Sequence, residues 1–368
     1  MSTEFRAAVL LLAVLPQASA FAQSNNAEPL ETLAEVVVVG SFPGPPLWKV
    51  SKDGHALWIL PLVDMYPKKM QWESARVEKL IGESQEYISR PVVASGIYTS
   101  NPLLLVWVLS LYNTMVHLPG EKTLADVLPP DVYQRFRAVK SRYFPRNSGI
   151  EKLAVSGAAR AMQKEILQQE NLESLNMTSA NSPLLITEQT DKWVKGNKAI
   201  RRTKTGVGLN HKLTARELKA LAATMKVVAA TPAFVDAEAA CFEKILAYFE
   251  NDLGPVKRRA NAWARGRIDD LVNPTPLYSV RNACINPFSA NADFPEMKKL
   301  LENEPGLAAP DLVELGRKSR QQWLDAAEAA LSRNTTTFAL LFVNDVLDKD
   351  GLVAQLESKG YKVEISAE

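Results

Sequence analysis

The chain has 368 residues, 46% of them hydrophobic, which is enough apolar material for one large α/β domain or two small ones. Its 43 Lys and Arg residues nearly balance its 41 Asp and Glu residues, leaving a formal charge of +2. So small a net charge provides no broad basic field, and it favours neither a nucleic acid nor an anionic bilayer as partner.

Residues 1–22 have the layout of a secretory signal peptide. Arg6 precedes an apolar run over residues 7–15, and the small residues Ala18, Ala20 and Ala22 supply cleavage sites. The run is too short to cross a bilayer as a permanent helix. We therefore predict a periplasmic or secreted protein with no stable membrane span after signal removal. A buried N-terminal helix is the alternative.

Residues 23–45 are predicted to form a leader that contains one short strand. Four valines lie between Glu35 and Gly40, and valine favours strands. The segment resembles the EVVVTG element near the mature N-terminus of TonB-dependent outer-membrane receptors. This resemblance implies a helper of a TonB-linked system that docks by strand addition. An ordinary edge strand is the other interpretation.

Residues 46–72 predict two strands, a turn and the start of a helix. Apolar residues flank Asp53-Gly54, and Asp-Gly between apolar runs is a strong hairpin signal because glycine accepts a positive φ. Asp64 and Pro67 follow the second strand. Functional sites often lie at such strand ends.

The same stretch carries a family resemblance. It resembles the opening hairpin of the TraB/GumN proteins, relatives of the Tiki metalloproteases, through Leu47-Trp48, Val50, His55, Leu57-Trp58 and Leu60. In that family the hairpin ends in a Gly-x-x-His that supplies a metal ligand. The resemblance puts Pro61 at the glycine and Asp64 at the histidine.

The C-terminal end repeats the resemblance. Residues 350–364, DGLVAQLESKGYKVE, are similar to the family's ending, and the apolar run 337–343 before them predicts a central strand buried on both faces. The family has a second Gly-x-x-His there, which puts Phe342 at the glycine and Asp345 at the histidine. Arg320, on the preceding helix, matches a family arginine.

A third family position is a glutamate that closes the strand after the first helix. The resemblance puts Arg90 there, although a slip of a few residues would bring Glu83 or Glu86 into play. Asp64 and Asp345 suit a hard ion such as Mn²⁺ or Mg²⁺. The bulk of Pro61 and Phe342 and the charge of Arg90 argue instead for a lost site.

Helical patterns dominate between these two ends. Residues 101–119 are the most apolar run after the signal, and we predict a buried helix capped by Asn101 with Pro102 at its first position. Further helices are predicted over 214–230 and 310–331. The fold class is therefore α/β, mixed α+β in character, with a central mixed β-sheet surrounded by many helices in one domain over residues 46–368.

Two cysteines, Cys241 and Cys284, occur in a chain predicted to enter an oxidising compartment. We expect a disulfide between them, which would close a loop of about 40 residues and stabilise the fold by about 4 kcal/mol. Two buried free thiols are the alternative.

Three functional hypotheses remain open. The leading one is an exported TraB/GumN-like pseudoenzyme that needs no cofactor and binds or scaffolds a periplasmic protein or peptide. The second is an active metal-dependent hydrolase or protease with Asp64 and Asp345 as ligands and Glu83 or Glu86 as third ligand or general base. The third is the accessory role in a TonB-linked system.

Overall fold

A computed structural model describes residues 42–67, 72–98, 101–118, 120–174, 190, 192, 194–251, 253–271, 294–308 and 311–366. Every structural statement below concerns these residues. The predicted signal peptide, the valine-rich segment Glu35–Gly40 and Cys284 lie outside them.

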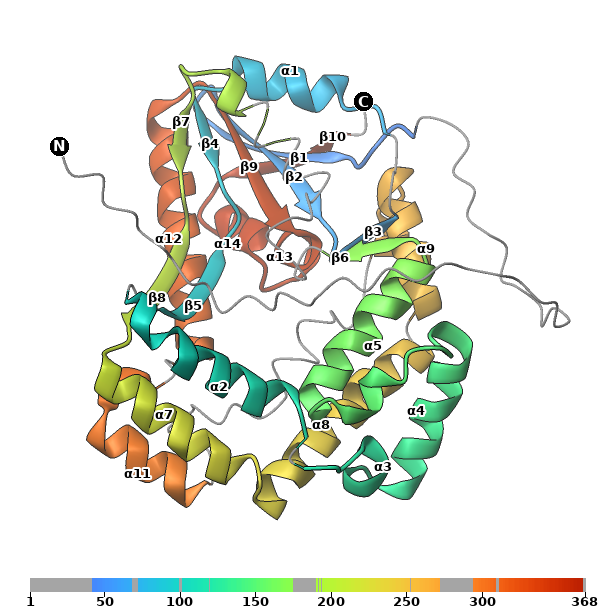
Figure 1. The fold of residues 1–368 in the computed structure, drawn as a ribbon. Helices are drawn as coiled ribbons and strands as arrows, with labels where there is room; N and C mark the ends of the chain where they lie inside the picture. The colour runs from blue at the N-terminus through green and yellow to red at the C-terminus, as the bar shows by residue number, and fades with distance from the viewer. Residues whose placement is uncertain are drawn as a thin grey trace, which may run out of the picture.

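A six-stranded mixed sheet forms the upper half of the molecule in Figure 1, with strand order β10-β1-β2-β9-β4-β7. Strands β2, β9, β4 and β7 are parallel, whereas β1 is antiparallel to both of its neighbours. The predicted α/β class with a central mixed sheet is confirmed. The strands are β1 (Leu47–Lys52), β2 (His55–Leu62), β4 (Glu86–Ile88), β7 (Arg201–Thr203), β9 (Thr336–Phe342) and β10 (Lys362–Ser366).

The β1–β2 hairpin is closed by a two-residue turn. Lys52 pairs with His55, and between them Asp53 and Gly54 have φ values of 50° and 85°. Positive φ at both central residues gives a turn whose twist matches that of the flanking strands. The predicted hairpin is therefore confirmed.

Strand β9 is the centre of the sheet, and helices cover both of its faces. Phe338 and Leu340 pack on one side with α1 (Ala75–Glu83) and α9 (Leu253–Ala264). Ala339 and Leu341 pack on the other with α12 (Leu312–Arg333) and α14 (Leu352–Ser358). Because five consecutive residues of β9 are buried, the predicted central strand is confirmed.

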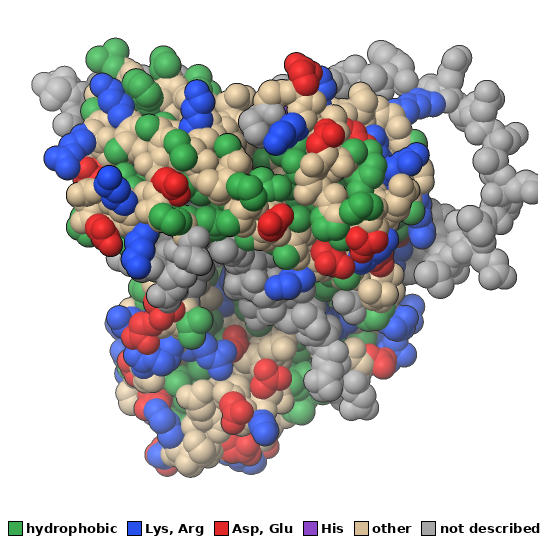
Figure 2. Space-filling view, turned by 90° about the horizontal axis from the view of Figure 1, so that it is seen from below, with side chains coloured by type: hydrophobic (Ala, Val, Ile, Leu, Met, Phe, Trp, Pro, Cys, Tyr) green, Lys and Arg blue, Asp and Glu red, His purple; other side chains and the backbone are tan. Residues whose placement is uncertain are grey.

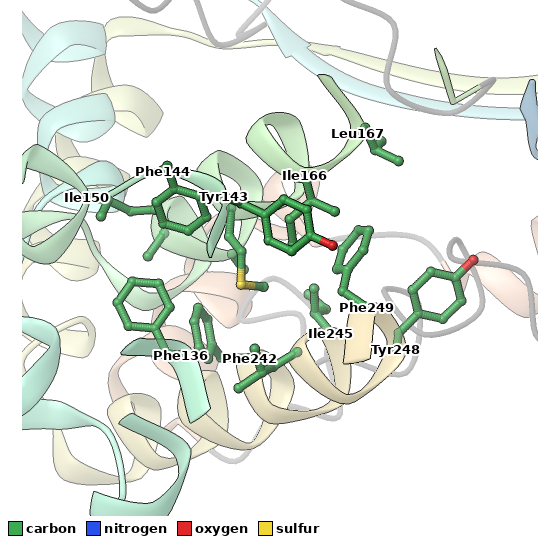
Figure 3. Packing of buried hydrophobic residues seen from close by; sticks show 14 of the residues in the cluster. Phe136, Tyr143, Phe144, Ile150, Ile166, Leu167, Phe242, Ile245, Tyr248 and Phe249 are labelled. Atoms are coloured by element: carbon green, nitrogen blue, oxygen red, sulfur yellow. The ribbon is translucent and has the colours of Figure 1, made fainter. Parts of the chain in front are cut away.

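A helical unit at the lower right of Figure 1 has its own apolar core. Phe136, Phe144 and Phe242 stack ring against ring in it, and Figure 3 shows this packing. Cys241 is half-buried against the same core. The helices are α3 (Leu124–Val127), α4 (Pro130–Tyr143), α5 (Val155–Gln169) and α8 (Pro232–Asn251).

A second helical unit lies at the lower left and consists of α2 (Leu105–Val116), α7 (Ala215–Val228) and α11 (Pro295–Asn303). Thr214 caps α7 by accepting a hydrogen bond from the Glu217 N–H group. The predicted helix is present as α2, and the prediction that it is buried holds for its inner face but is wrong for its outer face, which is exposed. Asn101 caps this stretch as predicted by accepting a hydrogen bond from the Leu103 N–H group, and Pro102 begins a short 3₁₀ turn, Pro102–Leu104, that leads into α2.

Two short ribbons complete the fold. One pairs β3 (Met65–Pro67) with β6 (Leu172–Ser174), and the other pairs β5 (Val92–Tyr98) with β8 (Gly206–Lys212). Within the described ranges, no single helix is both long and apolar enough to cross a bilayer. Helices α7 and α8 reach that threshold only together, and the chain bends by 81° between them.

Candidate functional site at the carboxyl end of the sheet

Three neighbouring parallel strands end at one edge of the sheet, and a charged residue follows each of them. Leu62 at the end of β2 pairs with Phe342 at the end of β9, and β4 lies on the other side of β9. Asp64 follows β2, Arg90 follows β4, and Asp345 lies on α13 (Val343–Leu347) after β9. This edge is where open α/β sheets usually place a ligand.

Asp64 is a buried carboxylate held near arginine. It is 5% exposed, and its Oδ2 lies 3.7 Å from Nη2 of Arg259, which is itself buried on α9. Among the described residues, no donor reaches Asp64 Oδ2 at hydrogen-bonding distance. Burial raises the pKa of Asp64, although the positive charges of Arg259 and Arg90 act to lower it. The carboxylate is therefore screened by arginine but incompletely hydrogen-bonded.

Aromatic rings cluster beyond the end of β2, and one of them, Tyr66, lies close enough to Asp64 for the aspartate charge to raise its pKa. The Trp263 Nε1–H group donates a 2.7 Å hydrogen bond to the carbonyl of Pro61, and the Tyr66 hydroxyl accepts one of 2.8 Å from the Val63 N–H group. The rings of Tyr66 and Trp72 meet that of Trp263 edge to face, at centroid distances of 5.1 and 5.5 Å. Because burial also raises the pKa of Tyr66, its phenol stays neutral at physiological pH.

Asp345 is buried in the first turn of α13 and forms an ion pair with Arg320 of α12. The backbone around it is tightly packed against Gly351. A Cβ atom on Gly351 would lie 2.6 Å from the carbonyl oxygen of Asp345 and 2.7 Å from that of Asp348. The glycine of the Asp-Gly motif is therefore required by a close backbone approach.

Arg90 contributes the third charge at this edge. Its guanidinium lies over the ring of Phe342, with Cζ 4.8 Å from the ring centroid, an arrangement typical of a cation–π contact. Burial lowers the pKa of Arg90, and the neighbouring Tyr66, Tyr87 and Asp64 raise it. Arginine nevertheless stays protonated in proteins, so it brings a fixed positive charge to Asp64.

The structure does not bring Glu83 or Glu86 to this edge. Glu86 is the first residue of β4 and pairs in register with Thr337, near the start of β9, so it lies at the amino end of the sheet. Phe342 is five residues further along β9, which corresponds to about 17 Å. Glu83 is the last residue of α1 and faces Lys79.

Glu86 instead joins a hydrogen-bonded network at the amino end. Arg333 and Asn334 donate to its Oε2 at 2.6 and 2.8 Å, and Thr203 donates to its Oε1. Burial alone would raise the pKa of Glu86, but these hydrogen bonds outweigh it, and the pKa falls below the ordinary value. This carboxylate ties α12, β4 and β7 together, and its partner Asn334 also donates to Thr337 of β9.

The residues at the carboxyl end do not fit a divalent metal. Each of the two aspartates already has an arginine partner, and the third position is arginine itself. Nowhere in the described part of the chain do three His, Cys, Asp or Glu side chains gather as a metal-binding group. Ligand carboxylates need an open position and supporting hydrogen bonds, whereas here both carboxylates are paired with guanidinium groups.

Comparison with known proteins identifies the chain at the family level. The model of the TraB/PrgY/gumN family matches residues 46–365, nearly its whole length. The chain belongs to the TraB/PrgY/gumN family. No curated protein and no solved structure gives a match. Membership of this family confirms the resemblance that the two sequence motifs indicate.

Sequence reasoning missed three parts of the site in this TraB/PrgY/gumN protein: Arg259, Tyr66 and Trp263. The sequence did contain one indication of Arg259. It lies on the same side of α9 as Val256 and Trp263, where an apolar residue is expected. A charge on an apolar stripe needs a buried partner. Which partner it meets depends on contacts between residues far apart in the chain.

Proposed function

We propose that this protein is an exported, periplasmic member of the TraB/PrgY/gumN family whose metal-hydrolase site has been replaced by arginine–carboxylate pairs. In this proposal it acts by binding or scaffolding a periplasmic protein or peptide. One observation carries the proposal: Asp64 and Asp345, which the family resemblance puts at the metal-binding positions, contact Arg259 and Arg320.

Electrostatics support the loss of metal chemistry. At an effective dielectric constant of about 20, a divalent cation about 5 Å from one guanidinium is repelled by about 7 kcal/mol. Arg259 and Arg90 both act on Asp64, so an ion there would meet more than one such charge. Two carboxylates already neutralised by arginine offer little attraction to offset this repulsion.

Packing supports the same proposal. A catalytic metal needs one open position for water or substrate. Beside Asp64, the rings of Tyr66, Trp72 and Trp263 are buried, and Trp263 uses the Pro61 carbonyl as its hydrogen-bond acceptor. Ordered, closed packing of this kind suits a rigid framework that presents an outer surface to a partner.

The competing hydrolase hypothesis keeps one favourable feature, since Asp64 and Asp345 follow adjacent parallel strands. It lacks the third ligand that the sequence suggested, because Glu86 lies at the opposite end of the sheet. A hydrolase would therefore need Arg259 or Arg320 to move away on metal binding. That requirement makes the hypothesis testable.

The decisive experiment is a peptidase and esterase screen of the mature protein with and without Mn²⁺, Mg²⁺ and Zn²⁺. Asp64→Asn and Asp345→Asn are the test variants, and Asp348→Asn, at an exposed position close in sequence, is the matched control. We expect no metal-dependent hydrolysis by any of them. Metal-dependent turnover that Asp64→Asn abolishes and Asp348→Asn retains would overturn the proposal.

Export and partner binding have separate tests. Fractionation of cells expressing the full chain should place the protein in the periplasm with its N-terminus after residue 20 or 22; cytoplasmic full-length protein would contradict export. Pull-downs should then compare the mature protein with a form lacking residues 23–45. Equal recovery of partners would exclude the strand-addition role of Glu35–Gly40.

A further inference from the structure

Helix α2 belongs to a long stretch without formal charge. Between Arg90 and Glu121 the sequence contains no Lys, Arg, Asp or Glu. The first part of the helix, Leu105–Leu109, is wholly apolar, whereas Ser110, Asn113 and Thr114 further along it are polar. A helix segment that is apolar on every side is normally buried, so the surface position of this first part calls for a physical explanation.

Burial of its inner face accounts for only some of the apolar residues of α2. Leu104, Val108 and Leu111 are buried in the core shared with α7 and α11. On the outer side, Leu103 is 83% exposed, Val106 71% and Leu109 56%. Trp107 is 39% exposed. Exposed apolar side chains gathered on one helix face mark an interaction surface more often than scattered single ones do.

One lysine of α7 borders this apolar face, and a second projects from the same side of α7. Lys219 Nζ lies 5.6 Å from the centroid of the Trp107 ring. Lys226 is seven residues further along α7, two helical turns, and so it projects from the same side. Both lysines are exposed, whereas Glu217, the only acidic residue of α7, is buried. Figure 2 shows hydrophobic side chains interspersed with Lys and Arg, and with Asp and Glu, on the face seen from below.

We propose that the outer face of α2, bordered by Lys219 and Lys226, docks on the surface of an anionic bilayer. Apolar residues including tryptophan, flanked by lysines, form the pattern of helices that lie in the membrane interface. The 12 residues of α2 span about 18 Å, too short to cross the hydrocarbon core, so the helix lies on the membrane. The small net charge of the whole chain conceals this local arrangement.

Charge complementarity favours a bilayer over a second copy of the chain. In a two-fold symmetric dimer the same patch faces itself, so the lysines of one copy would approach those of the other. Anionic headgroups instead place negative charge opposite Lys219 and Lys226, with a gain of about 1 kcal/mol for each lysine near the surface. The uncharged stretch around α2 presents no carboxylate to repel them.

Vesicle co-sedimentation of the full chain tests the proposal. The probes are vesicles of phosphatidylglycerol with phosphatidylethanolamine, and vesicles of phosphatidylcholine alone. We expect binding to the anionic vesicles that weakens with salt. The double variant Val106→Gln/Leu109→Gln should bind about tenfold more weakly, because both changes remove exposed apolar groups. Lys219→Gln should reduce binding to anionic vesicles about fivefold.

Val313→Gln is the matched control, because Val313 is 82% exposed on α12 and lies outside the α2 surface. It should bind like the wild type, and equal thermal stability of all variants shows that folding is unaffected. Absence of binding to anionic vesicles, or equal binding by the double variant, would overturn the proposal. So would sedimentation showing a lipid-free dimer that the double variant dissociates, since the face would then pair with a second copy.

Discussion

The two ends of the central parallel strands hold buried carboxylates in opposite ways. At the amino end, Glu86 is fully hydrogen-bonded and its pKa is lowered. At the carboxyl end, Asp64 is buried beside arginines with one oxygen lacking a hydrogen-bond donor among the described residues, and its pKa is raised. A buried carboxylate whose oxygens all accept hydrogen bonds stabilises the fold. A buried carboxylate that lacks a donor at a strand end is instead a candidate functional site.

The comparison also explains how a site can lose its chemistry while the fold persists. The amino end joins α12, β4 and β7 through Glu86, and the carboxyl end joins α9 to the end of β2 through Trp263 and to Asp64 through Arg259. Both therefore contribute to stability. Of these two ends, only the carboxyl end holds a buried carboxylate, Asp64, with an oxygen that no donor reaches among the described residues.

The largest effect is expected for Trp263→Ala at the carboxyl end. Removal of this fully buried ring should lower the free energy of unfolding by about 3–5 kcal/mol. Trp263→Phe keeps a ring but leaves the Pro61 carbonyl without its donor, and should cost about 1–3 kcal/mol. Urea denaturation measures both. A loss below about 1 kcal/mol for Trp263→Ala would show that the ring does not hold the site closed.

Glu86→Gln tests the amino end. At neutral pH the variant should be less stable by about 1.5–3 kcal/mol, because it loses charge-assisted hydrogen bonds. The folded-state pKa of Glu86 is depressed, so its stabilisation is present above the ordinary value of 4.5 and is lost as pH falls through the folded-state pKa. The difference from wild type should therefore shrink in acid. A difference that is constant from pH 7 to pH 3 would contradict this account.

Asp64→Asn should show the opposite pH dependence. The folded-state pKa of Asp64 is raised, so its favourable contribution is complete below the ordinary value of 3.8 and is lost as pH rises through the folded-state pKa. The stability of the variant relative to wild type should therefore increase from pH 4 to pH 7, by about 1 kcal/mol. Urea midpoints across that range measure it. A relative stability that falls with pH would mean that the arginines outweigh the burial and lower the pKa of Asp64, which would contradict this account.

Glu83→Gln should have the smallest effect. Glu83 and Lys79 are both more than half exposed and 3.9 Å apart, and exposed pairs of this kind contribute less than about 0.5 kcal/mol. A change above about 1 kcal/mol in thermal or urea unfolding would give Glu83 a role that its position does not explain.

The sequence predicts the parts of the fold that depend on local patterns. The Asp53-Gly54 turn and the apolar run of β9 lie where alternation and turn chemistry place them. Helix α2 was misjudged because a run of apolar residues does not reveal which of its faces another element covers. The tertiary fold decides that, since α7 covers only the inner face.

The candidate site was predictable in part. Family resemblance identified Asp64 and Asp345, and the topology brings both to one edge of the sheet. Glu86 was misplaced because β4 has only three residues, and the pattern does not say at which end of so short a strand a glutamate lies. Arg259 was missed because it lies 195 positions after Asp64, and only tertiary packing brings them together. The predicted disulfide stays a prediction, since Cys284 lies outside the described residues.

Calorimetric titration with Mn²⁺ tests the central claim most directly. It should compare the mature protein with the double variant Asp64→Asn/Asp345→Asn. If arginines have taken the place of a metal, neither protein should show saturable one-site binding. Binding of one Mn²⁺ per chain that the double variant loses would contradict that claim and restore the metal-hydrolase hypothesis.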